Sequence, residues 1–189
     1  MTFYKRSLWV LTAFFGLLFM LSGVVMITQG YAAKTEVKNE IAAEKLTIPA
    51  AERPDGSTDE VVLKEVPAEY RGAAVTDAAG LRYMRAVIRG HTLNSTGGKT
   101  FSEMPRTIPK LDEAGNPVLD EDGKSVMVPN TARDLWITST TLQTALMQGY
   151  LALKVADLVT GVGALAIALG AAMLFVLTPV AFAKKTQGV

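Results

Sequence analysis

The chain has 189 residues, 49% of them apolar, and a formal net charge of +1, which gives no general attraction to nucleic acid. It has no cysteine, which excludes disulfides, thiolate catalysis and cysteine-ligated metal centres, and its single histidine, His91, excludes a multi-histidine site within the chain. The apolar residues concentrate near the two ends, so the composition predicts membrane spans around one modest polar domain.

The first predicted element is an uncharged run from Leu8 to Gln29. An apolar helix of about 20 residues crosses the hydrocarbon of a bilayer. A cleaved signal peptide is the alternative, but the run is longer than a usual signal core, and Tyr31 is a poor residue where cleavage needs a small one. We expect an uncleaved transmembrane helix that continues as a stalk to about Leu46.

The polar middle of the chain begins with a loop over Pro49 to Thr58, after which Val61 to Val66 predicts a short strand. A helix is predicted over 76–94, with Thr76 or Asp77 as its N-cap. One side of this helix is apolar and includes Leu81, Met84, Val87, Ile88 and His91.

The other side of the 76–94 helix carries a stripe formed by Arg82, Arg85 and Arg89. These arginines are candidates for contact with anionic lipid headgroups or with acidic residues of a partner, and a solvated face is the alternative. His91 lies at the edge of the apolar side, where a histidine is more often packed and hydrogen-bonded than a ligand.

A β-hairpin or small meander is predicted over 107–128, because short apolar segments alternate there with Asp, Asn and Gly. Asp112, Asp120 and Asp122 are weak candidate ligands for calcium. A calcium loop needs six to eight oxygen ligands, and aspartate is also a common turn residue. We therefore predict no metal or other cofactor.

Asn130 is predicted to cap one long helix from about Thr131 to about Phe182. Its uncharged part, Leu158 to Ala183, forms the second span, and Asp157 is expected to pair with Lys154 just before it. A row of leucines is expected to face the stalk: Leu135, Leu142, Leu146 and Leu153.

Positive charges flank both spans, with Lys5 and Arg6 before the first, and Lys184 and Lys185 after the second. The positive-inside rule places both ends in the cytoplasm. The predicted organisation is therefore a cytoplasmic segment 1–7, a span 8–29, an extracytoplasmic domain 30–157, a span 158–183 and a cytoplasmic segment 184–189, in the plasma membrane.

Both spans contain small residues, which let helices approach closely in lipid. Span two carries them on two sides, more than one neighbouring helix requires, so a further helix partner is predicted. The alternative is that the two spans simply pack on each other. The residues predicted to pack against partner helices are Gly16, Gly23, Gly161, Ala164, Ala168 and Ala171; a second small stripe consists of Gly163, Ala166 and Gly170.

Several segments together resemble an uncharacterised family of small actinobacterial membrane proteins with an N-terminal span, an extracytoplasmic domain and a C-terminal span. They are Ala42 to Pro49, Ala86 to Ile88 with His91, Gly97 to Met104, and Arg133 with Thr140 and Leu142; Asp112 to Val128 resembles an insertion. Members are sometimes labelled aromatic ring-opening dioxygenases. A non-haem iron site takes two histidines and a carboxylate, so one histidine does not support that label.

The predicted fold class is a mainly α membrane protein, a two-helix hairpin whose helices extend into a small α domain with a β-hairpin. No recognisable nucleophile motif accompanies His91, so an enzyme is not expected. We predict an accessory subunit of a larger integral membrane complex, such as a respiratory or other redox or monooxygenase complex. The alternatives are an extracytoplasmic module that binds or senses a lipid, polymer or metal, and a homo-oligomeric scaffold.

Overall fold

The computed structural model describes residues 8–186, except for the side chains at 181 and 184–186. The predicted segment 1–7 and the end of the predicted segment 184–189 lie outside the described residues. The fold is mainly helical with one two-stranded sheet. Two compact units are present: a hairpin unit, which contains residues 8–43 and 151–186, and a central unit, Glu44–Tyr150.

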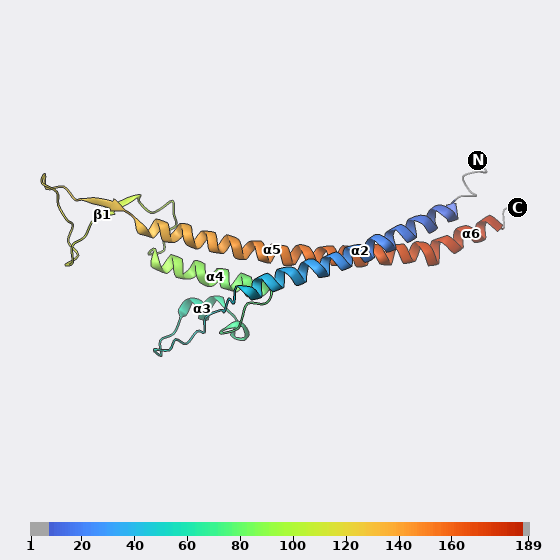
Figure 1. Ribbon diagram of the computed structural model, residues 1–189, viewed down its shortest axis with the longest axis horizontal. Helices are drawn as coiled ribbons and strands as arrows, with labels where there is room; N and C mark the ends of the chain where they lie inside the picture. Colours follow the sequence, from blue (N-terminus) through green and yellow to red (C-terminus); the bar gives the residue numbers. More distant parts are fainter. Residues whose placement is uncertain (1–7, 187–189) are drawn as a thin grey trace. The chain divides into compact units, whose positions relative to one another are not determined.

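The hairpin unit consists of α2 (Leu8–Ala43) running antiparallel to the second part of α5 (Thr131–Ala172), the π-helical turn η2 (Met173–Leu177) and α6 (Thr178–Thr186), as Figure 1 shows. By length and composition, Leu8–Ala43 and Thr131–Val180 could each cross a membrane. As predicted, α2 continues beyond Gln29. It ends at Ala43 rather than near Leu46, and Lys45 adopts a left-handed φ of 50° there.

The π-helical turn η2 interrupts what was predicted to be one α-helix up to Phe182. The Thr178 N–H donates to the carbonyl of Met173, five residues earlier, and the Thr178 hydroxyl donates to the same carbonyl at 2.8 Å. Pro179 explains the interruption, because its ring would collide with the carbonyl four residues earlier in a regular α-helix. A wider turn relieves that collision.

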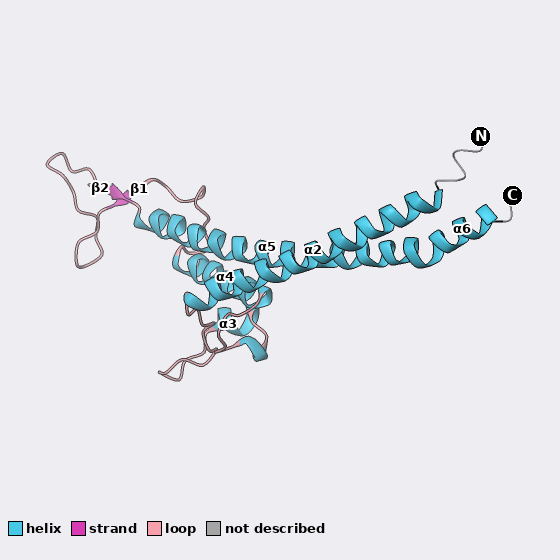
Figure 2. Cartoon of the chain, turned by 45° about the vertical axis from the view of Figure 1, so that its right-hand side comes forward, coloured by secondary structure: helices cyan, strands magenta, loops and turns pink. Residues whose placement is uncertain are grey.

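The core of the central unit gathers around α3 (Glu60–Glu65), the 3-10 turn η1 (Ala68–Tyr70) and α4 (Ala78–Ser95). Backbone hydrogen bonds join the loops around these helices: the Ile48 N–H donates to the Ala73 carbonyl, and the Val75 N–H donates to the Leu46 carbonyl. Figure 2 shows these helices and the loops between them. The most deeply buried side chains are Ile48, Val62, Val66, Val75, Leu81 and Val87.

The predicted strand at Val61 to Val66 is wrong, because this stretch forms α3. Asp59 caps the first turn by accepting hydrogen bonds from the N–H groups of Val61 and Val62. Valines favour strands by local propensity. Here the cap and the burial of Val62 outweigh that propensity, and the Val61 side chain packs directly on Gly90 of α4.

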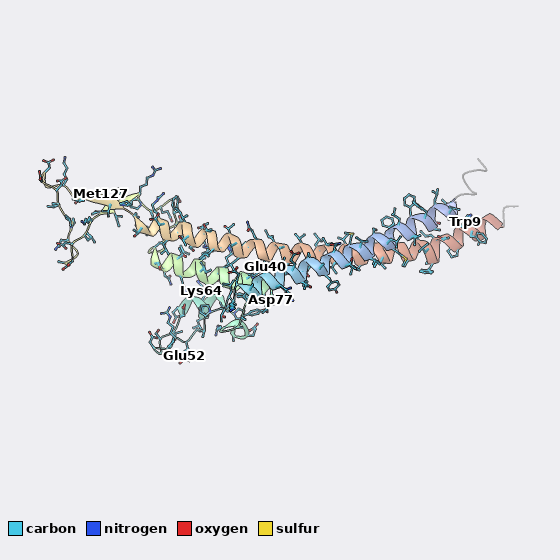
Figure 3. All side chains as sticks on the ribbon, viewed as in Figure 1. Trp9, Glu40, Glu52, Lys64, Asp77 and Met127 are labelled. Carbon is cyan, nitrogen blue, oxygen red and sulfur yellow. The ribbon has the colours of Figure 1, made fainter. Side chains whose placement is uncertain are left out.

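The predicted helix over 76–94 is confirmed as α4, and Asp77 is its N-cap, with the Asp77 carboxylate accepting from the Gly80 N–H at 2.7 Å. The predicted β region is also confirmed. Strand β1 (Thr107–Pro109) pairs antiparallel with β2 (Met127–Pro129), which carries the labelled Met127 in Figure 3. Single bridges at Leu111–Pro117 and Leu119–Ser125 extend the narrow ribbon.

The first part of α5 packs against α4 through a face that the leucine row did not predict. The predicted leucine row divides: Leu146 and Leu153 are buried, whereas Leu135 and Leu142 are 44% and 52% exposed, so the buried contact expected for these two is wrong. Ser139 and Gln143 are buried instead, and the Ser139 hydroxyl lies 2.5 Å from the Thr92 hydroxyl of α4. A polar contact of this kind cannot be recognised from an apolar periodicity.

Candidate functional site

A seam of glycines closes the hairpin unit. Gly23 lies against Gly163: a Cβ added to Gly23 would be 2.6 Å from the Gly163 carbonyl oxygen, and one added to Gly163 would be 2.8 Å from the Gly23 carbonyl oxygen. Gly16 and Gly170 face each other in the same reciprocal way. Each carbonyl therefore approaches the opposite Cα, the geometry in which weak Cα–H···O contacts contribute.

The seam separates the small residues of α5 into two rows. Gly163 and Gly170 form the inward row, so Gly16 and Gly23, predicted to pack against partners, are buried within this chain. A Cβ added to Gly161 would meet nothing within 4 Å. The outward row consists of exposed Gly161, Ala164 and Ala168, with Ala171 partly exposed.

An ion pair joins α2 to α5 within the hairpin unit. The Lys34 ammonium donates to the Asp157 carboxylate at 2.6 Å, although Lys154 was the predicted partner of Asp157. The hydrogen bond from Lys34 lowers the pKa of Asp157, to which Lys154 adds a smaller effect, and the same bond raises the pKa of Lys34. Both side chains are more than a third exposed, so the pair contributes little stability.

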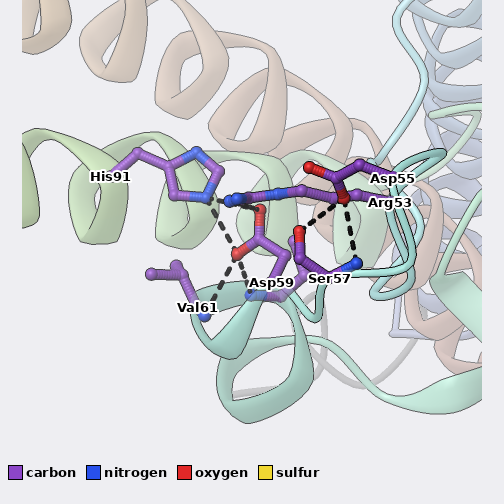
Figure 4. A network of polar contacts seen from close by, with 7 residues as sticks. Arg53, Asp55, Ser57, Asp59, Val61 and His91 are labelled. Atoms are coloured by element: carbon purple, nitrogen blue, oxygen red, sulfur yellow. Dashed lines mark hydrogen bonds and ion pairs between the residues drawn. The ribbon is translucent and has the colours of Figure 1, made fainter.

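The central unit contains a buried carboxylate, Asp59, whose side chain is only 6% exposed (Figure 4). His91 Nε2 lies 3.0 Å from Asp59 Oδ1 and 2.9 Å from Oδ2, and Arg53 Nη2 donates to Oδ2 at 3.0 Å. The N–H groups of Val61 and Val62 donate to the same carboxylate, so the loop that carries Arg53, helix α3 and helix α4 all contact it. Because a carboxylate only accepts, Nε2 of His91 is the donor in this contact.

His91 therefore occupies the packed, hydrogen-bonded position that its sequence context predicts. It also lines a hollow of about 230 Å³ with hydroxyl and apolar side chains from α4 and α5. Among the described residues, Asp59 is its only hydrogen-bond partner, and no hydroxyl is positioned for activation by its imidazole. The arrangement anchors the 50–59 loop to α4 and does not resemble a nucleophile–base pair.

The charge on Asp59 makes the stability of the central unit depend on pH. Burial alone would raise its pKa, but the hydrogen bonds from His91, Val62 and Arg53 outweigh burial and lower the pKa from 3.8 to about 2. Since the folded pKa lies below that of an unfolded aspartate, the stabilisation is complete above about pH 4 and is lost as the pH falls towards 2.

We predict that wild type is more stable than Asp59→Asn at pH 6 and that this difference disappears near pH 2, because asparagine keeps the helix cap but lacks the charge. The measurement is the thermal unfolding midpoint of both proteins across that range. A difference that does not change with pH would contradict the assignment.

The arginine stripe of α4 splits into two environments. Arg82 contacts the neighbouring Tyr83 ring, with its Cζ 5.2 Å from the ring centroid. Arg85 and Arg89 instead border a hollow of about 320 Å³ between α4 and α5, and Arg89 Cζ lies 5.8 Å from the centre of the Trp136 ring. The α5 wall comprises Trp136, Thr140, Gln143, Thr144 and Met147.

No protein-family model, curated protein or solved structure matches this chain. The resemblance to the actinobacterial family therefore stays a prediction, and the function has to be argued from the residues themselves.

Two of the three candidate calcium ligands, Asp112 and Asp120, have structural roles in turns, whereas Asp122 takes part only through its backbone N–H. Asp112 Oδ1 accepts from the N–H groups of Ala114 and Asn116, and Asp120 Oδ1 accepts from those of Asp122 and Lys124. Within residues 8–186, no three His, Asp or Glu side chains are grouped as a metal site would require. Turn formation accounts for the Asp-rich pattern of this ribbon.

Arg133 is a structural residue that sequence reasoning did not single out for a role. Its guanidinium donates to the carbonyls of Phe101 and Met104 at 3.0 and 2.6 Å and stacks on the Phe101 ring, with Cζ 3.8 Å from the ring centroid. It therefore fixes the 101–104 loop to the start of α5. Nothing in the spacing along the chain links these residues, which are about 30 positions apart.

Proposed function

We propose that this chain is a non-catalytic accessory subunit of a larger integral membrane complex. One observation carries the proposal. The inward row of α5 packs against α2 in the glycine seam, whereas no helix of the hairpin unit covers the outward row. Large apolar side chains of the same helices are also exposed, for example Phe14, Leu21, Leu165 and Phe175. A bilayer and a neighbouring helix would cover such a surface.

The proposal includes insertion of both long helices in the plasma membrane. The charged flanks favour an orientation with cytoplasmic ends and residues 30–157 outside. The outside segment would brace the outer parts of the host, and a respiratory, other redox or monooxygenase complex is the proposed type of host.

The test is purification of the full chain from native membrane in mild detergent, with mass spectrometry of the particle. We expect other integral membrane subunits to co-purify. Ala164→Leu and Ala168→Leu should reduce this association, since leucine prevents close helix approach. Ser22→Leu, which adds the same bulk at an exposed position of α2, is the matched control. A particle containing only one 20.2 kDa chain would refute the proposal, and several copies of that chain would favour the scaffold alternative.

A second candidate function is a binding module outside the membrane. The specific observation in its favour is the hollow beside Arg85 and Arg89, which combines two cations with an aromatic wall. The grouped acidic side chains that a metal-binding version would need are not found among residues 8–186.

A further inference from the structure

Two arginines of the central unit lie in a concave setting with no counter-charge. Arg85 and Arg89 are one turn apart on α4 and border the same hollow, and no acidic residue lines it. Among the described residues, Lys34, Arg53 and His91 form ion pairs with Asp157 or Asp59, and no ion pair is formed by Arg85 or Arg89. Arg85 and Arg89 therefore keep their positive charge available to a ligand from outside the chain.

The other arginines that build the central unit behave differently. Arg53, Arg71 and Arg133 each donate hydrogen bonds to a carboxylate or to backbone carbonyls of the fold. The Arg85 guanidinium makes no hydrogen bond to any described residue, and Arg89 only lies over Trp136. Neither arginine donates a hydrogen bond to a group of the folded chain, so a structural role does not explain this pair.

The wall opposite the arginines adds hydrogen-bond donors. Gln143 donates through Nε2 to Ser139 Oγ and keeps a second amide N–H. The Thr140 hydroxyl forms no hydrogen bond within the described residues. Two planar guanidinium groups, one amide and one hydroxyl offer more donors than the two oxygens of a carboxylate can use, whereas a phosphate presents more acceptor oxygens.

The hollow is larger than a phosphate ion requires. Its volume of about 320 Å³ and the apolar surfaces of Trp136 and Met147 leave room for an organic substituent. We propose that this hollow binds a phosphate group carried on a small organic molecule or a lipid headgroup, with Arg85 and Arg89 contacting the phosphate and Trp136 packing against the substituent. This inference develops the binding-module function and does not depend on the accessory role, so either can fail without the other.

Trp136 provides a direct reporter. The chain has two tryptophans, so Trp9→Phe leaves Trp136 as the only one. The full chain carrying Trp9→Phe, in an uncharged detergent, is titrated in one arm with glycerol phosphate and in the other with phosphatidylglycerol diluted into the micelles, with phosphatidylcholine as the zwitterionic comparison. We expect a saturable change in Trp136 fluorescence, weakened by salt, in at least one arm.

Arg85→Gln and Arg89→Gln should each weaken this binding by about tenfold, because each removes charge-assisted hydrogen bonds to the anion. Arg85→Lys should bind more tightly than Arg85→Gln, because lysine keeps the positive charge but lacks the paired donors of the guanidinium group. Arg106→Gln is the control, because Arg106 is exposed and does not line the hollow. Saturation with glycerol phosphate would show that the headgroup suffices, and saturation with phosphatidylglycerol alone would assign the site to lipid. No response in either arm, or equal binding by the Gln variants, would overturn the proposal.

Discussion

Replacing Gly163 by leucine is expected to open the hairpin unit. A Cβ at this position would lie 2.8 Å from the Gly23 carbonyl oxygen and 3.0 Å from the Ile27 backbone nitrogen, and a backbone cannot move aside as a flexible side chain can. The helices must separate, which we expect to cost on the order of 3 kcal/mol, the upper part of the usual range for overpacking. The neighbouring contact between Gly16 and Gly170 would also weaken, because it depends on the same close approach of the two helices.

Cysteine cross-linking measures this opening, because the chain has no cysteine of its own. The hydroxyls of Thr12 and Thr178 are 3.1 Å apart, so cysteines at these two positions should cross-link efficiently on oxidation. Gly163→Leu should strongly reduce the yield. Gly161→Leu is the matched control, since it makes the same change two residues away in open space. Equal yields in both variants would show that the seam does not hold the helices together.

Replacing Asp59 by alanine is expected to be the most destabilising single truncation of a polar side chain in the central unit. The change removes the cap of α3 and the hydrogen bonds from Arg53 and His91. Loss of a cap costs about 1 kcal/mol, and hydrogen bonds to a charged group about 1.5–3 kcal/mol, so the free energy of unfolding should fall by about 2–4 kcal/mol. Denaturant titration followed by Trp136 fluorescence in the Trp9→Phe background measures it.

Asp55→Ala provides the comparison for Asp59→Ala. Asp55 lies in the same loop and accepts from the N–H and hydroxyl of Ser57, but it is exposed (Figure 4). Its loss should change the free energy of unfolding by well under 1 kcal/mol, as usual for an exposed polar residue. If the two variants are equally stable, the Asp59 network does not organise the central unit.

The parts of the fold that follow from local signals were predictable from the sequence. The long uncharged runs predicted α2 and the last part of the C-terminal helix, Asp77 marked the start of α4, and the Asp-Gly turns marked the ribbon. These features depend on composition, capping and turn chemistry within a few residues. The packed histidine at position 91 was also recognisable from its place at the edge of an apolar face.

The remaining features depend on contacts between distant segments. A valine-rich hexapeptide is helical because Asp59 caps it and α4 covers it, and neither fact is visible in the hexapeptide. The partner of His91 is 32 positions away in the chain. Sequence reasoning recognised two small stripes on span two but could not say which one faces α2, because that choice depends on how the two helices are rotated against each other.

The spacing of the seam limits how the lengths of these helices can vary. Gly16, Gly23 and Gly30 recur every seven residues on α2, and Gly163 and Gly170 recur at the same interval on α5. Gly30 continues the seam, because it packs against Ala156 and Thr160 of α5. Seven residues are close to two complete helical turns, whereas removing one residue turns everything beyond it by about 100°. Deleting a single residue between Gly16 and Gly23 would therefore turn one of them outwards, into lipid if the helices span the membrane. Insertions and deletions in this part of the chain should be tolerated only in steps of seven, matched on both helices.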